Sequence, residues 1–176
     1  MKVQKLDHVA LYMNDRDTAA AFLTSCLGFH VVDRTDRYTL VGAGGRIGKL
    51  TLFDAPDDTT PTPGLIERIN VRVADPETAV ARLPAEADII SRNGGFLATG
   101  PEGLPLALVP GEGDFTEYDL EGLVLRSGDP ESSARRFVEM GFASGSLPAR
   151  SPSPRNRARM PPDLRSAERC LRDRTP

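Results

Sequence analysis

Few residues of this 176-residue chain have the chemistry of an active site. The chain has two histidines, His8 and His30, and two cysteines, Cys26 and Cys170. The imidazole of His8 belongs to a strand-like run and could ligate a divalent metal, whereas His30 begins another run, where a surface position is expected. No Ser-His-Asp or Cys-His arrangement for nucleophilic catalysis is recognisable. We therefore assign no catalytic residue from these side chains.

A glycine-rich segment at residues 42–48 follows a predicted strand and has the composition of a phosphate-binding loop. A dinucleotide-binding loop must open a helix whose N-terminus faces the pyrophosphate. Residues 49–53 instead alternate between apolar and polar side chains, as a strand does. We therefore expect a wide hairpin here and no nucleotide or other organic cofactor.

Three similar segments repeat along the chain and must position whatever chemistry it has. Each is a strand-like run that leads to an aspartate suited to cap a helix. The same offset of seven residues separates His8 from Asp15, Arg68 from Asp75 and Gly122 from Asp129. Repeats with this spacing are typical of a supersecondary unit of one helix and several strands. The repeat predicts that His8, Arg68 and Gly122 occupy equivalent positions.

Each repeat predicts a strand, a helix and then further strands. In the first unit we expect strands at 5–13, 29–32, 38–41 and 49–53, and a helix that Asn14 or Asp15 caps and Gly28 ends. In the second we expect strands at 68–73, 88–91, 95–99 and 104–109, with a helix opening at Pro76. The third has a strand at 120–125 and a helix at 130–140, with an inner face of Ala134, Phe137 and Val138.

Composition limits the class of protein. A net charge of −3 and 39% hydrophobic residues fit an ordinary soluble protein. No apolar run reaches the roughly 20 residues that span a bilayer, and the N-terminus lacks the apolar stretch of a signal peptide. Two cysteines do not make a disulfide framework, so we expect a cytoplasmic protein that binds no membrane. The tail at 144–176, rich in arginine and proline, is expected to be disordered and not to bind nucleic acid, because it lacks interleaved aromatic residues.

The first two repeats have the order strand, helix and three strands, and they follow one another along the chain. This order resembles the βαβββ unit of the vicinal oxygen chelate superfamily, which includes glyoxalase I, extradiol ring-cleavage dioxygenases and bleomycin-resistance proteins. The residues that carry the resemblance are Leu6-Asp7-His8-Val9-Ala10-Leu11, Leu27-Gly28-Phe29 and Gly100-Pro101-Glu102-Gly103. It implies an α+β fold of tandem βαβββ units that form a curled mixed-sheet cleft. It also implies a module at 1–112 made of two units (1–57 and 65–110), and an incomplete third unit at 117–143.

The resemblance implies a metal site in the cleft, with ligands from the first and last strands of paired units. His8 stands where the first histidine belongs, and would ligate Fe(II), Mn(II), Ni(II) or Zn(II). The other ligand positions fall at about Thr51, at Arg68 and at about Ala107, none of which is a strong ligand. We therefore expect this chain alone to bind a metal weakly or not at all.

Two pairings of the units remain open. Units one and two could pair around a metal-free cleft, or unit one could pair with a fourth unit that a full-length relative carries. The change in composition after Ser146 favours a truncated four-unit chain or a replaced C-terminus. A homodimer through the incomplete third unit is expected, because the helix at 130–140 would otherwise leave its apolar face uncovered.

Two functions follow from the resemblance. The first is that of a metal-dependent enzyme lineage, either a ring-cleavage dioxygenase (an oxidoreductase) or a glyoxalase-like lyase, which acts on small vicinal-oxygen substrates and is impaired in this chain alone. The alternative is a metal-free protein that sequesters a small molecule, as bleomycin-resistance proteins do. In that case Arg68 or Arg72 would pair with a carboxylate or phenolate of the ligand.

Overall fold

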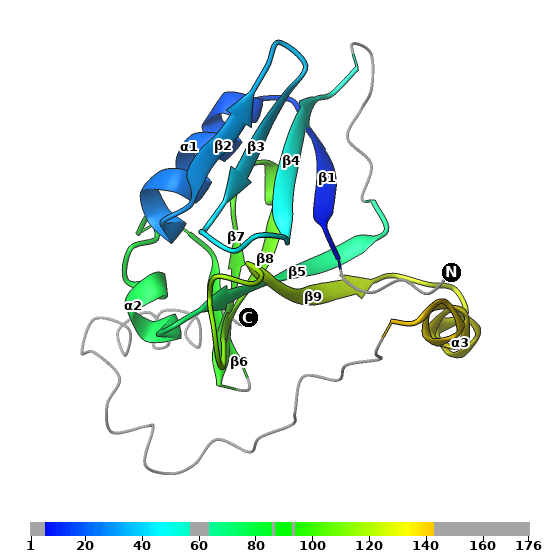
Figure 1. Cartoon of the computed structure of the whole chain (residues 1–176). Helices are drawn as coiled ribbons and strands as arrows, with labels where there is room; N and C mark the ends of the chain where they lie inside the picture. The colour runs from blue at the N-terminus through cyan, green and yellow to red at the C-terminus, as the bar shows by residue number, and fades with distance from the viewer. Residues whose placement is uncertain (1–5, 57–63, 86, 93, 143–176) are drawn as a thin grey trace, which may run out of the picture.

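The computed structural model describes residues 6–56, 64–85, 87–92 and 94–142, which form two β-sheets with helices on one side of each (Figure 1). The first unit consists of β1 (His8–Met13), α1 (Arg16–Leu27), β2 (His30–Arg34), β3 (Tyr38–Gly42) and β4 (Lys49–Asp54). The second consists of β5 (Ile66–Val73), α2 (Pro76–Val80), β6 (Ile89–Arg92), β7 (Gly95–Thr99), the 3₁₀ turn η1 (Pro101–Gly103) and β8 (Pro105–Pro110). β9 (Leu120–Leu125) and α3 (Pro130–Met140) follow. The predicted tail at 144–176 lies outside the described residues.

The first unit forms a four-stranded sheet in the order β1-β4-β3-β2. β1 runs parallel to β4, and the other neighbours are antiparallel. Side chains alternate along β1: Val9 and Met13 are buried under α1, whereas His8, Ala10 and Tyr12 are exposed on the other face. We call that other face, with Thr51 and Phe53 of β4, the His8 face.

The second unit repeats this arrangement with an added strand, in the order β6-β7-β8-β5-β9. β5 runs parallel to β8, as β1 does to β4. The apolar side chains on one face of β5, β7 and β8 join the main core under α2, among them Ile69, Val71, Phe96, Leu106 and Leu108. The opposite face, which we call the Arg68 face, carries Arg68, Asn70, Ala107, Gly122 and Val124.

The register confirms that the two sheets are built alike. Ala10 lies opposite Thr51, and Asn70 lies opposite Ala107. Because Ala10 follows His8 by two residues and Asn70 follows Arg68 by two, His8 and Arg68 occupy equivalent positions. The last strand-to-strand hydrogen bonds also correspond, since Ala55 N donates to Met13 O and Gly111 N donates to Val73 O.

All three helices begin at the predicted aspartates. The carboxylate of Asp15 accepts from the amide of Thr18, Asp75 accepts from Glu77 and Thr78, and Asp129 accepts from Ser132. Gly28 and Gly141 end α1 and α3 in the left-handed conformation, with φ of 73° and 104°, which glycine adopts without the strain of a side chain. The repeat therefore sets the starts of all three helices and the ends of α1 and α3, whereas α2 ends at Ala81 without a left-handed residue.

The sequence left open whether the first strands of units one and two pair with each other, and in the structure they do not. The first strand of unit two pairs antiparallel with the first strand of unit three, not with that of unit one. β1 has β4 as its one strand neighbour within the described part of the chain, and lies at the outer edge of its sheet (Figure 1). Among the described residues, the first strand of unit one therefore pairs with neither of its two equivalents.

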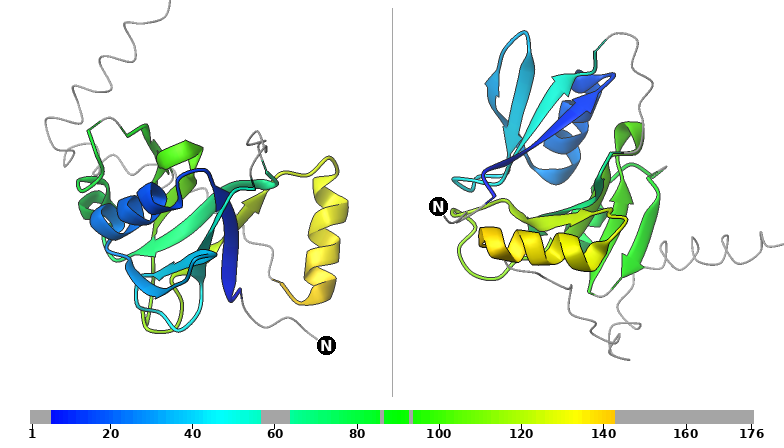
Figure 2. Two further views of the ribbon diagram at one scale, coloured as in Figure 1. Left: turned by 90° about the horizontal axis from the view of Figure 1, so that it is seen from above. Right: turned by 90° about the vertical axis from the view of Figure 1, so that its right-hand side faces the viewer.

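The two sheets lie at a steep angle to each other, with α3 standing apart beyond the end of β9 (Figure 2). No residue of α3 is buried, and Phe137, Val138 and Met140 are exposed by 37%, 50% and 45%. The predicted apolar face is therefore uncovered by the described residues. No helix within the described ranges has the length and apolar character needed to cross a membrane.

Candidate functional site

His8 begins β1 on the face away from α1, so its ring does not enter the core. Its side chain is 53% exposed, and Nδ1 lies 3.0 Å from a carboxylate oxygen of Asp7. Across the sheet its neighbour on β4 is Lys49. Solvent or a ligand can therefore reach the imidazole.

His30 cannot share a metal with His8. It lies on β2, opposite Gly42 of β3, whereas His8 lies on β1 at the far edge of the same sheet. Three strand spacings separate the two strands, about 14 Å in all. His30 is exposed, as expected of a surface residue.

The donors around His8 do not fit a tightly bound divalent metal. Catalytic metal sites in proteins usually need three protein ligands. The residues described contain no group of three or more histidine, cysteine or acidic side chains that could hold a metal. Thr51 occupies the predicted ligand position on β4, and a neutral hydroxyl is a weak ligand. Lys49, the residue opposite His8 on β4, has a cationic side chain that cannot ligate a metal.

Lys49 is occupied by an ion pair that joins the two units. Its Nζ lies 2.8 Å from Oδ2 of Asp119, the residue before β9, and it also donates to the carbonyl of Gly45. Asp119 is buried, and its carboxylate accepts from the amides of Ala43 and Gly45 as well. The carboxylate thus satisfies three donors from unit one.

The contacts around this ion pair explain why residues 42 and 45 are glycines. A Cβ on Gly45 would lie 2.7 Å from the Cα of Tyr118, and one on Gly42 would lie 2.8 Å from Oδ2 of Asp119. The glycines therefore allow close approach of the segment before β9, and the predicted hairpin between β3 and β4 is confirmed. The sequence signal for Asp119 was weak, because the residues it joins are far apart in the chain.

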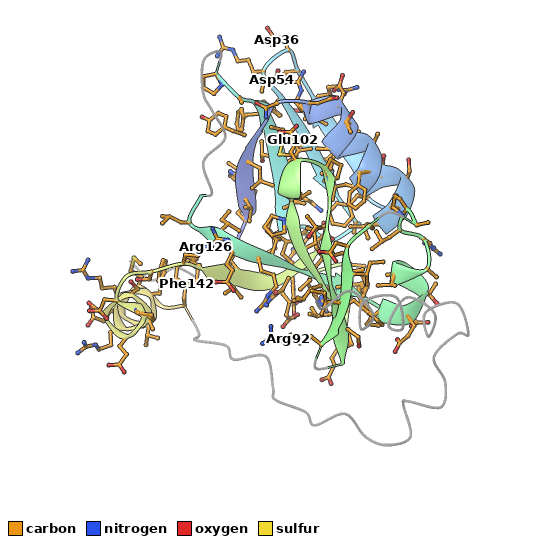
Figure 3. The ribbon with its side chains drawn as sticks, turned by 180° about the vertical axis from the view of Figure 1, so that it is seen from behind. Asp36, Asp54, Arg92, Glu102, Arg126 and Phe142 are labelled. Atoms are coloured by element: carbon orange, nitrogen blue, oxygen red, sulfur yellow. The ribbon has the colours of Figure 1, made fainter. Side chains whose placement is uncertain are left out.

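A second carboxylate, that of Glu102, ties the units together at the start of α1. Glu102, at the tip of the β7–β8 hairpin, accepts from the backbone amides of Asn14 and Asp15 at 2.8 and 2.6 Å (Figure 3). Its φ of 54° is in the left-handed region, which is costly for a residue with a side chain. The hydrogen bonds to the start of α1 hold it there.

The second sheet presents a different set of polar groups. Asn70 is 8% exposed, and its side-chain oxygen has no hydrogen-bond partner. Nε of Arg68, two residues earlier on the same face, is also buried without a partner. Such groups normally have one. A Cβ on Gly122, directly opposite Asn70, would meet no atom within 4 Å, so there is room beside the amide.

Arg72 has a structural role on this face. Its side chain is fully buried, and its guanidinium donates to the carbonyls of Glu112, Asp114 and Tyr118. It also stacks over the rings of Phe115 and Tyr118, at 4.7 and 3.9 Å from their centroids. Arg72 therefore anchors the segment at 111–119. Its Nε makes no hydrogen bond, but lies 3.4 Å from a carboxylate oxygen of Glu121, whereas Nε of Arg68 has no such carboxylate beside it among the ion pairs of the described residues.

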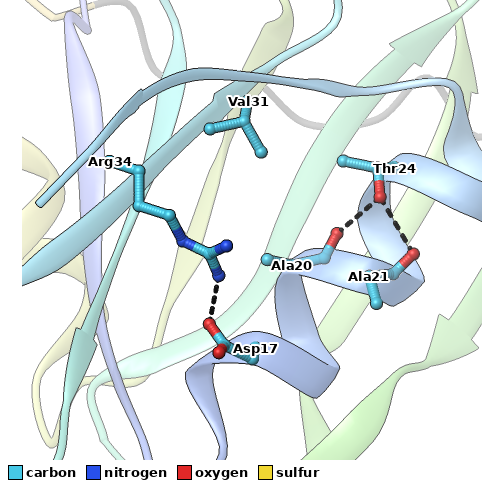
Figure 4. Close-up of a pocket in the computed structure, with 6 residues that line it drawn as sticks. All are labelled: Asp17, Ala20, Ala21, Thr24, Val31 and Arg34. Atoms are coloured by element: carbon cyan, nitrogen blue, oxygen red, sulfur yellow. Dashed lines mark hydrogen bonds and ion pairs between the residues drawn. The ribbon is translucent and has the colours of Figure 1, made fainter.

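A separate hollow lies between α1 and β2, on the helix side of the first sheet (Figure 4). Its polar groups already have partners, because Arg34 pairs with Asp17 and the Thr24 hydroxyl donates to the carbonyls of Ala20 and Ala21. It is on the opposite side of the sheet from His8. We assign it no ligand.

Comparisons with known proteins identify the family. The model of the Glyoxalase/Bleomycin resistance protein/Dioxygenase superfamily matches residues 5–143. No curated protein matches the chain. Among solved structures, a glyoxalase I mutant from Zea mays is 20% identical with a TM-score of 0.59, and covers 74% of this chain. This chain spans 53% of that one, about half its length.

An antibiotic-binding protein from Streptomyces sp. CB03234, TnmS3, is 19% identical with a TM-score of 0.52. That match covers 64% of this chain and 99% of TnmS3. At these identities the likeness shows the fold alone. The match of the family model over most of the chain goes further, and agrees with the tandem βαβββ units: the chain belongs to the Glyoxalase/Bleomycin resistance protein/Dioxygenase superfamily.

Proposed function

We propose that this chain binds a small, largely apolar molecule at the Arg68 face of the second sheet, without a metal. The observation that carries the proposal is that two buried polar atoms there, Arg68 Nε and Asn70 Oδ1, have neither a hydrogen bond nor, unlike Arg72 Nε, an ion-pair partner. Arginine pairs well with carboxylates, and an amide oxygen accepts from a hydroxyl or amine. The ligand would therefore carry an anionic oxygen and a neighbouring donor.

The surroundings of these two groups support an apolar body for the ligand. Ala107 and Gly122, which flank Asn70 on either side, are small, and Val124 lies opposite Arg68. Small molecule sites in proteins typically combine apolar walls with a few placed polar groups. An aromatic ring that carries a carboxylate or phenolate has both properties.

Titration with 2,3-dihydroxybenzoate tests this function, and uncharged catechol is the matched ligand. A charge-assisted hydrogen bond contributes about 1.5–3 kcal/mol, so Arg68→Gln should weaken binding of the benzoate by about tenfold or more. Catechol binding should change much less. Arg126→Gln, which removes an exposed arginine at the end of β9, is the control. Equal losses in the two variants, or no binding to the unaltered chain, would contradict the proposal.

A second candidate is the metal-dependent enzyme, of the ring-cleavage dioxygenase or glyoxalase-like type. It is favoured by the exposed ring of His8 on an edge strand, where ligands from another unit or another chain could complete a site. His8 would hold the metal, and the metal would polarise two vicinal oxygens of the substrate. Metal content of the purified chain separates this candidate from the first.

A further inference from the structure

We infer that Gly122 determines the size of the ligand at the Arg68 face, because its missing side chain leaves the space that the ligand's ring occupies beside Asn70. The inference rests on the proposed function. It adds the residue that selects the ligand and the side of Asn70 on which the ligand lies. The backbone conformation of Gly122, its neighbours and the burial of Asn70 carry it.

The backbone at Gly122 does not require a glycine. Gly28 and Gly141 have a positive φ, which residues with a side chain rarely adopt, whereas Gly122 has none. It lies inside β9, where a glycine weakens the strand, since it has no side chain to pack and loses more conformational freedom on folding. The fold therefore gains nothing from the conformational freedom of this residue.

No neighbouring atom excludes a side chain at this position. A Cβ on Gly95, a glycine of β7, would collide with the carbonyl oxygen of Leu108, so that position must lack a side chain. A Cβ on Gly122 would meet no atom within 4 Å. A glycine inside a strand often marks a bulge or a place where a ligand or another backbone approaches closely.

The bulge in the β5–β9 pairing does not account for the glycine. The register shifts between Asn70 and Val71, which leaves Glu121 as the extra residue of β9. Bulges that need a glycine place it in the left-handed conformation. No residue at 120–125 has a positive φ, so this bulge needs no glycine. Close approach of a ligand is then the reason that fits the surroundings of Gly122.

The buried amide of Asn70 makes this space a site. Its side-chain oxygen has no hydrogen-bond partner, and the residue is 8% exposed. Ala107, its neighbour on β8, is 1% exposed, so the β8 side of the amide is closely packed. Gly122, its neighbour on β9, is partly exposed and has open space around it. The ligand therefore lies on the β9 side of Asn70.

This placement fixes which part of the ligand Gly122 selects. The anionic oxygen pairs with Arg68, a hydroxyl or amine donates to Asn70, and the ring that joins these two groups lies against the backbone of Gly122. Val124, opposite Arg68, is the next residue of β9 on this face and borders the same space. A side chain at position 122 would occupy the place of the ring.

Substitution of Gly122 tests the inference through two properties that should change in opposite directions. Gly122→Ala should raise the melting temperature by about 1–4 °C, because alanine restricts the unfolded chain and meets no atom in the folded one. The same variant should bind 2,3-dihydroxybenzoate more weakly, and Gly122→Val should bind it about tenfold more weakly or worse, as expected when methyl groups fill a ligand's space. A fall in the melting temperature of Gly122→Ala would show that the fold needs this glycine, and would overturn the inference.

Catechol distinguishes a loss of space from a loss of charge. Gly122→Val should weaken the binding of catechol and of the benzoate by similar factors, because both carry the ring, whereas Arg68→Gln should weaken mainly the benzoate. Gly128→Val is the matched control, since Gly128, in the loop between β9 and α3, also has open space and no positive φ. It should leave both affinities unchanged. A loss confined to the benzoate, or an equal loss in Gly128→Val, would overturn the inference.

The inference and the proposed function fail in different ways. If the unaltered chain binds neither ligand, the proposed function is wrong, and the role of Gly122 is wrong with it. If the unaltered chain binds both ligands and Gly122→Val binds them as tightly, the Arg68 face keeps its function and only the role of Gly122 is wrong.

Discussion

Lys49 Nζ lies 2.8 Å from Oδ2 of Asp119, and this ion pair joins a strand of the first sheet to the residue that precedes β9. Its two side chains are 13% and 2% exposed. Removing one partner of such a buried pair leaves the other charge without compensation. The pair is therefore a sensitive point in the contact between the two sheets.

Asp119→Ala should lower the free energy of unfolding by about 3–5 kcal/mol, because the ammonium of Lys49 and the amides of Ala43 and Gly45 all lose their acceptor. Urea denaturation measures the loss. Asp54→Ala is the control, because it breaks the ion pair of the exposed Asp54 carboxylate with Arg16 and should cost less than about 1 kcal/mol. Similar losses in the two variants would mean that the buried pair does not hold the sheets together.

The carboxylates that cap α1 and α2, Asp15 and Asp75, have lowered pKa values, so the stability of the fold should fall in acid. The hydroxyl and the amide of Thr18 both donate to Asp15, which lowers the pKa of this carboxyl below 3.8. A lowered pKa contributes stability that is present above the unfolded value and is lost as the pH falls through the folded value. Thr18→Val removes the hydroxyl, so it should reduce the loss of stability between pH 6 and pH 3.

The comparison is made by urea denaturation at the two pH values. Thr24→Val is the matched control, because the Thr24 hydroxyl donates to carbonyls of its own helix and not to a carboxylate. Its pH dependence should be that of the unaltered chain. If Thr18→Val keeps the full acid dependence, the cap of Asp15 is not its source.

The sequence alone was enough to predict features that depend on residues close together in the chain. The offset of seven residues to Asp15, Asp75 and Asp129 predicted the helix starts, and alternation along β1 predicted that Val9 lies under α1 and His8 on the other face. These are properties of short segments, set by capping and by strand geometry.

Features that depend on contacts between distant segments could not be predicted in this way. The burial of Arg72 requires the segment at 111–119 to fold over it, and nothing in the residues around position 72 specifies that contact. The pairing of β5 with β9 instead of β1 is of the same kind, since all three strands have similar sequences and positions in the repeat.

His8 should not hold a stoichiometric metal in this chain by itself. Protein purified without chelators and then equilibrated with Mn(II) should contain well under one ion per chain, because Thr51, Lys49 and Arg68 supply no second strong ligand. Elemental analysis of the unaltered chain and of His8→Ala should give the same content. One ion per chain that disappears in His8→Ala would contradict this and favour the enzyme over the metal-free binding protein.

The helix of the third unit should be the least stable element described. Phe137 follows its cap, Asp129, by eight residues, as Leu23 follows Asp15, but Leu23 is fully buried and Phe137 is 37% exposed. Leu23→Ala should therefore cost about 2–5 kcal/mol, as for a buried leucine, and Phe137→Ala much less. Urea denaturation at low protein concentration gives both values.

Hydrogen exchange distinguishes an uncovered helix from one that is covered in an assembly. Amides at 130–140 should exchange fast in dilute solution, because exposed helices open with little cost. If the predicted homodimer through the third unit forms, protection of these amides should rise with protein concentration, and Phe137→Ala should abolish the rise. Strong protection that does not depend on concentration would mean that this helix is already covered within a single chain, and that the face of Phe137 and Val138 is not available to a second copy.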